Sequence, residues 1–117
     1  MFIGTDIIEI SRFTIDLLQN DNFMDRYFTK MEQEYCQGAS NPAEHFAARF
    51  AGKEAAIKAL SGIRKTLPFN KIEIINDENG RPNLILYTDD PEILALKKDI
   101  SLSHSEKDAI AFVVMWI

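Results

Sequence analysis

The sequence predicts an α+β protein in which a mostly antiparallel sheet packs against one long helix and several shorter helices. Three observations support this fold class. Residues 2–10 alternate like a strand, residues 41–62 carry the signals of a long helix, and the residues after them are mainly short apolar stretches separated by turns. A chain of 117 residues is long enough for one ordinary core, so we expect a single domain over residues 1–117.

The first strand is predicted over residues 2–10, and a helix follows it over residues 11–20, where Ser11 can cap the start. Because successive side chains of a strand point to opposite faces, every second residue shares one face. The residues of that face are Phe2, Gly4, Asp6, Ile8 and Ile10.

Two further helices are predicted before residue 62. Thr29 and Glu32 have the spacing of a capping box, and Gly38 is a suitable end for the helix that they begin. The principal helix has cap, first-turn and stop residues in the expected order: Asn41, Pro42, Glu44 and Gly62.

The second half of the chain is predicted to be mostly strand. Residues 71–75 and 83–88 flank Asn79-Gly80, a dipeptide that favours a tight hairpin turn. Three more elements complete the chain: a short helix over 91–98 and two strands over 99–104 and 109–117, joined by a tight turn. The resulting order is β-α-α-α-β-β-α-β-β.

Composition excludes several classes of protein. The formal net charge of −5 argues against nucleic-acid binding, which usually needs a basic surplus. No apolar run approaches the ~20 residues that cross a bilayer, and the N-terminus lacks the pattern of a secretory signal, so no membrane association is expected. The single cysteine, Cys36, excludes an internal disulfide and fits a reducing, cytoplasmic location.

Two carboxylates stand on faces that are otherwise apolar. Asp6 shares its strand face with apolar residues, and a helical wheel places Glu54 in the arc of Phe46, Ala47, Phe50 and Ile57. A carboxylate that faces a core needs a cation or hydrogen bonds. A surface ion pair of Glu54 with Lys58 and a hydrogen-bonded Asp6 are the structural alternatives. If the two acids converge, they suit Mg²⁺ and chemistry on a phosphate.

Basic residues and a histidine could bind such a phosphate. Arg49, Lys53 and Lys58 share the principal helix, where Lys58 lies at one edge of the apolar arc and Lys53 borders it on the other side, and Arg64 and Lys65 follow the helix. The segment SLSHS at 101–105 surrounds His104 with hydroxyl groups. The segment lacks the G-x-S-x-G pattern of a hydrolase. His104 is therefore either a hydrogen-bonded structural histidine or a hydrogen-bond donor to a phosphate.

Three segments together resemble a known family. They are GTDIIEI near the N-terminus, RFAGKEAAIKAL in the middle and SLSHSEKDAIAFVV near the end. In this order and spacing they are similar to holo-[acyl-carrier-protein] synthase, the short bacterial type of 4′-phosphopantetheinyl transferase. The resemblance runs from residue 3 to about residue 115.

The resemblance implies a reaction and roles for individual residues. Such enzymes use Mg²⁺ and coenzyme A, transfer phosphopantetheine to a serine of apo acyl carrier protein, and release adenosine 3′,5′-bisphosphate. Asp6 and Glu54 match the metal-binding acids, Glu54 or a metal-bound water would be the base, and Lys58 matches the lysine at the cleaved phosphates. His104 matches a contact to the coenzyme phosphates. Further basic residues expected at the coenzyme are Arg49, Lys53 and Arg64.

The resemblance also implies an assembly. Family members are homotrimers with active sites between subunits, so His104 is expected to serve a neighbour's site, and part of the apolar run 112–116 is expected to lie at the trimer axis. Arg12 matches a position that meets the carrier, and Arg26 could join it.

The chain departs from the family pattern in three places, one of which is Gly52, where AGKEA stands in place of the usual AAKEA. Only Gly62 remains of a glycine-rich loop, where Arg64 and Lys65 could compensate, and basic residues are missing before the principal helix. A non-catalytic homologue that binds coenzyme A or another nucleotide is the chief alternative, and a trimeric structural protein is the third possibility.

Overall fold

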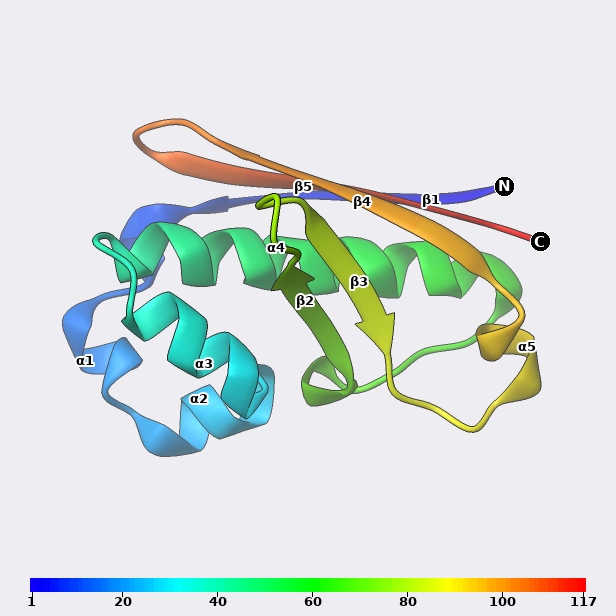
Figure 1. The fold of residues 1–117 in the computed structure, drawn as a ribbon, viewed down its shortest axis with the longest axis horizontal. Helices are drawn as coiled ribbons and strands as arrows, with labels where there is room; N and C mark the ends of the chain where they lie inside the picture. The colour runs from blue at the N-terminus through cyan, green and yellow to red at the C-terminus, as the bar shows by residue number, and fades with distance from the viewer.

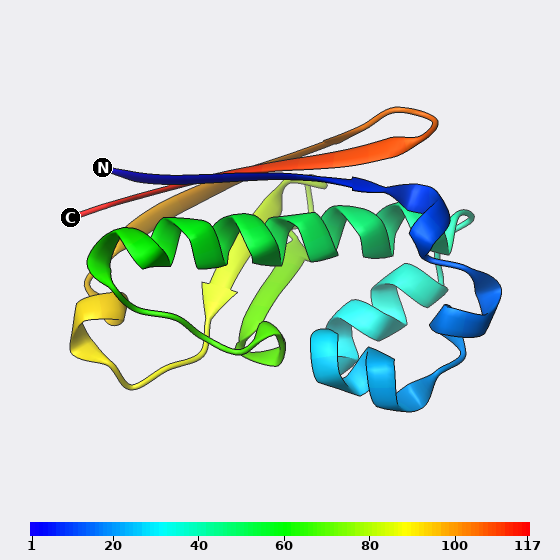
Figure 2. The same cartoon turned by 180° about the vertical axis from the view of Figure 1, so that it is seen from behind.

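A computed structural model describes residues 1–117, and it has three layers (Figures 1 and 2). One sheet forms the first layer, the long helix α4 (Pro42–Leu60) the second, and the remaining helices with a small hairpin the third. The other elements are β1 (Phe2–Glu9), α1 (Ile15–Leu18), α2 (Asp21–Tyr27), α3 (Lys30–Gln37), β2 (Ile72–Asn76), β3 (Pro82–Leu86), α5 (Pro91–Leu94), β4 (Lys97–His104) and β5 (Asp108–Trp116). Single 3-10 turns η1 (Ile10–Arg12), η2 (Ser61–Ile63) and η3 (Phe69–Lys71) connect them.

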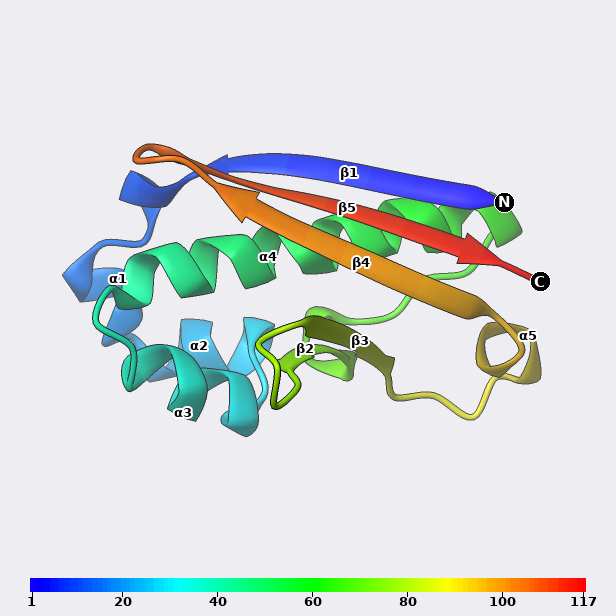
Figure 3. The same cartoon turned by 45° about the horizontal axis from the view of Figure 1, so that its top comes forward.

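All strand pairs are antiparallel, as the sequence predicts, but the strands form two sheets instead of one. The larger sheet has the order β1-β5-β4, and Figure 3 shows its three strands side by side above α4. The smaller sheet is the predicted hairpin of β2 and β3, which turns at Asn79-Gly80 with Gly80 at a φ of +81°. The α+β fold class is therefore confirmed.

Small residues allow α4 to lie very close to the larger sheet. A Cβ atom on Gly4 of β1 would stand 1.8 Å from the carbonyl oxygen of Ala55 and 3.0 Å from the amide nitrogen of Ala59. No side chain fits there, so only glycine permits this approach of strand and helix. On another side of α4, a Cβ atom on Gly52 would meet Ile74 of β2 at 2.4 Å. The helix is thus enclosed by both sheets.

Side chains from α3 and α4 satisfy the free edge of β2. Lys53 donates to the Ile72 carbonyl, Arg49 donates through Nε to the Ile74 carbonyl at 3.2 Å, and Glu32 accepts from the Ile74 amide at 2.9 Å. We call Glu32, Arg49 and Lys53 the buried charge cluster, since each of them is at most 2% exposed. The cluster completes the backbone hydrogen bonds that a neighbouring strand would otherwise make.

The local signals of the first half are partly correct. The capping box of α3, in which the Thr29 and Glu32 side chains bond each other's backbone amides, is confirmed. The cap at Ser11 is wrong, because the chain forms η1 there and Thr14 caps the short α1 through a bond from the Leu17 amide. Helix α2, capped by Asn20, was not predicted.

The ends of two later elements differ from the prediction. Pro42 begins α4 as expected, but Asn41 makes no side-chain cap bond, and α4 stops at Leu60 before the 3-10 turn that contains Gly62. Helix α5 ends at Leu94, not at residue 98, because Lys97 already begins β4. None of the helices combines the length and the apolar character that crossing a bilayer requires.

Candidate functional site

Asp6 and Lys58 meet beside α4. The Lys58 ammonium lies 3.3 Å from the Asp6 carboxylate and donates a hydrogen bond of 2.9 Å to the carbonyl of Thr5. The Asp6 side chain is 21% exposed and that of Lys58 is 55% exposed, so the pair is open to solvent on one side. The sequence places Asp6 on the inward face of β1, and the structure confirms this, because its strand neighbours on that face, Gly4 and Ile8, are buried.

Glu54 lies one turn before Lys58 on α4, so the two side chains project from the same flank of the helix. Glu54 is half-buried and takes part in no ion pair, because Lys58 pairs with Asp6 instead. The surface ion pair of Glu54 with Lys58, which was the structural alternative, is therefore not formed. The Glu54 carboxylate is left without a cation in the chain itself.

The donors at this place suit a hard cation such as Mg²⁺. They are the Asp6 carboxylate and the Thr5 carbonyl oxygen, which share the Lys58 ammonium, and the Glu54 carboxylate one helical turn before Lys58. No group of three or more acidic, histidine or cysteine side chains is close enough to hold a metal alone. Mg²⁺ commonly takes only one or two protein carboxylates and completes its shell with water and substrate phosphate. The residues present fit that mode of binding.

Lys53 does not reach the Asp6 side of the helix. Its ammonium is fully buried, lies 2.7 Å from Glu32 Oε1 and donates to the Phe69 carbonyl at 2.9 Å. Burial lowers the pKa of Lys53, and the adjacent Glu32 carboxylate opposes that shift. The expectation that Lys53 borders the apolar arc and binds coenzyme does not agree with this position, because its charge is already compensated within the buried charge cluster.

Arg49 is also turned inward. Its three guanidinium nitrogens donate to the Ile74 carbonyl, the His45 carbonyl and the Asn76 side chain, and its plane lies over the ring of Tyr35 at 4.5 Å. Arg49 lines a pocket but is only 2% exposed, so little of its side chain is accessible there. Its main role in this chain is structural.

His104 ends β4 and lines a pocket of ≈ 290 Å³. Its Nε2 atom lies 3.8 Å from the Glu44 carboxylate of α4, and its Nδ1 atom is 3.3 Å from the Ser105 carbonyl. The pocket is built from the start of α4, the β2–β3 hairpin and the end of β4. Its other lining residues are Glu44, His45, Ala48, Arg49, Asn76, Gly80, Pro82, Leu102 and Ser103. Sequence reasoning did not find His45 or Asn76, because no local motif marks a pocket assembled from three separate segments.

The two groups of functional residues lie at different places along α4. His104 contacts Glu44 near the start of the helix, and Asp6 contacts Lys58 near its end. Fourteen helical residues rise by about 21 Å. No hydrogen bond or ion pair joins His104 to Asp6, Glu54 or Lys58. The predicted site residues of one chain therefore lie in two separate groups.

The remaining predicted basic residues are exposed. Arg64 follows η2 in the left-handed conformation, with φ of 60° and ψ of 36°, and makes no ion pair. Its neighbour Lys65 is bonded to Asp90 at 2.8 Å, so this charge is partly neutralised. Arg12 lies in η1, and Arg26 in α2 lies over the Tyr27 ring at 5.5 Å.

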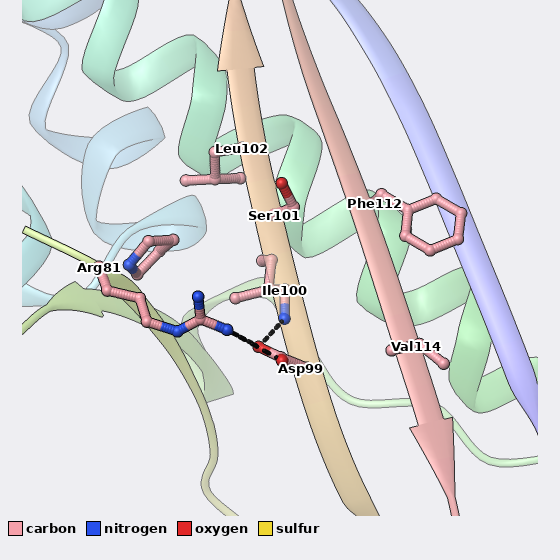
Figure 4. A pocket seen from close by; sticks show the side chains of 8 residues that line it. Arg81, Asp99, Ile100, Ser101, Leu102, Phe112 and Val114 are labelled. Atoms are coloured by element: carbon pink, nitrogen blue, oxygen red, sulfur yellow. Dashed lines mark hydrogen bonds and ion pairs between the residues drawn. The ribbon is translucent and has the colours of Figure 1, made fainter.

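The larger sheet has one face that nothing covers (Figures 1 and 3). This outer face, which points away from α4, exposes Ile3, Ile7, Ile110 and Phe112 by between 43% and 61%. At its β4 side the outer face continues into a pocket of ≈ 300 Å³, in which one guanidinium nitrogen of Arg81 donates to both carboxylate oxygens of Asp99 (Figure 4). In the run 112–116, Val113 and Met115 are buried against α4 while Phe112 is exposed, so only alternate residues of the run are free to lie at the expected trimer axis.

Comparison with known proteins identifies the family to which the chain is similar. Residues 2–115 match the 4′-phosphopantetheinyl transferase superfamily (ACPS). The holo-[acyl-carrier-protein] synthases of Geobacter metallireducens and Protochlamydia amoebophila are each 42% identical to the chain, over 96% of its length and 94% of theirs.

Solved structures have the same fold. A holo-(acyl-carrier-protein) synthase of Bacillus anthracis in complex with CoA (3′,5′-ADP) has a TM-score of 0.78 at 36% identity, covering 97% of this chain and 94% of that one. An ACPS–CoA complex of Chronobacterium ammoniagenes has a TM-score of 0.80 at 29% identity, covering 97% and 95%. With the inward-facing Asp6, the helix that carries Glu54 and Lys58, and the terminal hairpin that carries His104, these matches show that the chain belongs to the holo-[acyl-carrier-protein] synthases of the 4′-phosphopantetheinyl transferase superfamily.

Proposed function

We propose that the chain transfers the 4′-phosphopantetheine group of coenzyme A to a serine of apo acyl carrier protein and releases adenosine 3′,5′-bisphosphate, in a reaction that depends on Mg²⁺. The observation that carries this proposal is the meeting of Asp6 with Lys58, one helical turn from the unpaired Glu54. The relatives named above support the same reaction class, since they are holo-[acyl-carrier-protein] synthases and two of the structures contain coenzyme A or its 3′,5′-ADP part.

In the proposed reaction, a bond forms between the serine oxygen and the phosphorus that carries pantetheine. The bond from that phosphorus to the bridging oxygen breaks, and the bridging oxygen leaves with adenosine bisphosphate. In this proposal Lys58 neutralises the charge that grows on the leaving phosphate, since its side chain is half-exposed and its ammonium lies 3.3 Å from Asp6. A bound Mg²⁺ on Asp6 and Glu54 would supply Lewis-acid charge to the phosphate oxygens.

The serine proton needs an acceptor. Glu54 is our candidate, since its carboxylate lies on the same flank of α4 as Lys58 and makes no ion pair within the chain. A water molecule polarised at the same site is the alternative acceptor. Conversion of Glu54 to Gln distinguishes metal binding from proton transfer, because the amide keeps an oxygen ligand but cannot take a proton at neutral pH.

We propose that the complete site forms between two subunits of a homotrimer. Each chain presents His104 and the pair of Asp6 and Lys58 at separate places, so a neighbour's His104 pocket would complete the Asp6 site. The apolar outer face, with Ile7 opposite Ile110 in the strand register, supplies the surface that such an assembly would bury. In this assignment the His104 pocket holds the adenosine end of coenzyme A.

Arg12 and Arg26 are proposed to meet the carrier protein. The chain has a net charge of −5, so an acidic carrier requires a local positive patch. We expect Arg12→Glu to raise the KM for the carrier much more than that for coenzyme A. An equal rise in both would contradict this role.

The test is intact-mass spectrometry of apo acyl carrier protein incubated with the chain, coenzyme A and Mg²⁺, with EDTA in a parallel sample. A metal-dependent gain of one phosphopantetheine is expected, and Asp6→Asn, Glu54→Gln and Lys58→Met should each reduce its rate by at least about a hundredfold. Lys107→Gln serves as a matched control, since Lys107 is exposed on the terminal turn and outside both groups of site residues.

The chief alternative is a homologue that binds coenzyme A without transferring anything. Binding of coenzyme A with no mass gain for several carriers would favour that alternative over the transferase. Sedimentation of the wild type against Phe112→Asp tests the assembly, because a charge on the outer face should shift a trimer to monomers. A wild-type chain that sediments as a monomer at the concentration used for the assay would contradict the shared site.

A further inference from the structure

The only two histidines of the chain line the same pocket. His45 lies near the start of α4, and His104 lies at the end of β4. Both belong to the pocket of ≈ 290 Å³ that also contains Glu44 and Arg49. His45 is half-buried, and its ring stands edge-on to Tyr35 of α3 with ring centres 5.7 Å apart. The pocket therefore has an imidazole on two of its walls.

Arg49 is the permanent cation of the pocket, but its guanidinium group is already hydrogen-bonded within the protein. Each of its nitrogens already donates to a protein acceptor, namely Ile74, His45 or Asn76. Glu44 adds a negative charge to the same lining, so the formal charges of Arg49 and Glu44 cancel while both histidines are neutral. Protonation of both histidines gives the pocket a formal charge of +2. An anionic ligand would therefore receive most of its attraction from the imidazoles.

The charged groups around His45 come from few elements. On α4 they are Glu44 and Arg49, and on β4 the other titratable group is His104, whereas β2 contributes the uncharged Asn76 and α3 the phenol of Tyr35. Burial lowers the pKa of His45, and the charge of Arg49 lowers it further, while Glu44 acts in the opposite direction. The lowered pKa favours the neutral form of His45 in the empty pocket, and a bound anion would favour the charged form.

We propose that His45 is a specificity-determining residue that takes up a proton to bind the ribose 3′-phosphate of coenzyme A, across the pocket from His104. This inference rests on the proposed function, which assigns the adenosine end of coenzyme A to this pocket and the pyrophosphate to Lys58. A phosphomonoester carries a charge of about −1.5 to −2 near pH 7 and accepts charge-assisted hydrogen bonds. That group distinguishes coenzyme A from dephospho-coenzyme A.

The test compares two nucleotides that differ only in the 3′-phosphate: adenosine 3′,5′-bisphosphate and adenosine 5′-monophosphate. Their affinities are measured by calorimetry at about pH 8 and about pH 6.5, on either side of the range where an imidazole in contact with an anion titrates. For the wild type we expect the preference for the bisphosphate to rise about tenfold as the pH falls, which is the gain from one charge-assisted hydrogen bond. Protonation of the phosphate itself, with a pKa of about 6, acts in the opposite direction.

The deciding variant is His45→Phe, which keeps an aromatic ring beside Tyr35 but cannot bind a proton. It should lose about fivefold to tenfold in bisphosphate affinity near pH 6.5, keep the affinity for the monophosphate, and take up fewer protons when calorimetry is repeated in buffers of different ionisation heat. Lys107→Gln, which removes a positive charge outside the pocket, should retain the wild-type preference.

Two results would overturn the inference. One is a His45→Phe variant that keeps the wild-type preference near pH 6.5, and the other is a variant that loses affinity for both nucleotides equally. Either result would leave the transferase reaction standing, since that reaction is measured on the carrier by mass. A wild-type chain that binds neither coenzyme A nor the bisphosphate at either pH would overturn the proposed function and this inference together.

Discussion

Replacing Lys53 by methionine should remove a large part of the stability of this protein without touching the transfer site directly. The Lys53 side chain is fully buried and bonded to Glu32 and to the carbonyls of Phe69 and Ile72. Methionine fills a similar volume, but it leaves a buried carboxylate without a cation and removes a hydrogen-bond donor from two backbone carbonyls. The structure therefore assigns the loss to uncompensated charge and not to a cavity.

The expected magnitude follows from the burial of both partners, each of which has a side chain that is 0% exposed. Breaking a buried ion pair by removing one partner costs about 3–5 kcal/mol. A domain of this size has a free energy of unfolding of about 5–15 kcal/mol, so the loss is roughly a fifth of it or more, and the melting temperature should fall by roughly 15 °C.

Urea unfolding followed by circular dichroism measures this change. Lys65→Met is the matched control, since Lys65 pairs with Asp90 and Glu92 at the surface and should cost no more than about 1 kcal/mol. The reasoning would be refuted if Lys53→Met unfolded like the wild type and instead raised the KM for coenzyme A. That result would mean that the ammonium group serves the coenzyme and not the fold.

Three further predictions concern single positions. Gly4→Ala should lower the free energy of unfolding by about 3 kcal/mol, because the new methyl group meets backbone atoms of α4, and an unchanged urea midpoint would contradict it. Arg64→Gly should raise the free energy of unfolding by about 1 kcal/mol, since a left-handed residue with a Cβ is strained, and a lower melting temperature would refute this. The same variant should weaken coenzyme A binding if the guanidinium contacts a phosphate. Burial raises the pKa of Cys36 to about 12, so a thiol reagent should modify the native chain only as fast as it unfolds, and rapid labelling would disprove this.

Much of the fold could be predicted because several of its signals are local. The alternation of β1, the capping box of α3 and the Asn79-Gly80 turn each depend on neighbours in the sequence, and each is confirmed. The inward position of Asp6 follows from the same alternation. The extra helix α2 was missed because it spans only seven residues and follows directly on α1, so no separate apolar repeat marks it.

The burial of charges on α4 could not be predicted from a helical wheel. A wheel assumes one apolar face and one solvent face, but α4 lies between two layers and is buried on most sides. For this reason Lys53, which the wheel places at the border, is fully buried, while Glu54, which it places inside the arc, is half-exposed. Only the position of Glu32 in a distant helix explains why a lysine is tolerated there.

The alternation of β1 has a consequence for how this protein tolerates insertions. Asp6 faces α4, and the next residue, Ile7, belongs to the exposed outer face. A single residue inserted between Gly4 and Asp6 would turn the carboxylate to solvent and leave Thr5 or the inserted residue facing Lys58, whereas two inserted residues would return every later side chain to its original face. The strand can therefore accept insertions only in even numbers of residues. Variants with an odd number of inserted residues should lose activity even when every inserted residue favours a strand.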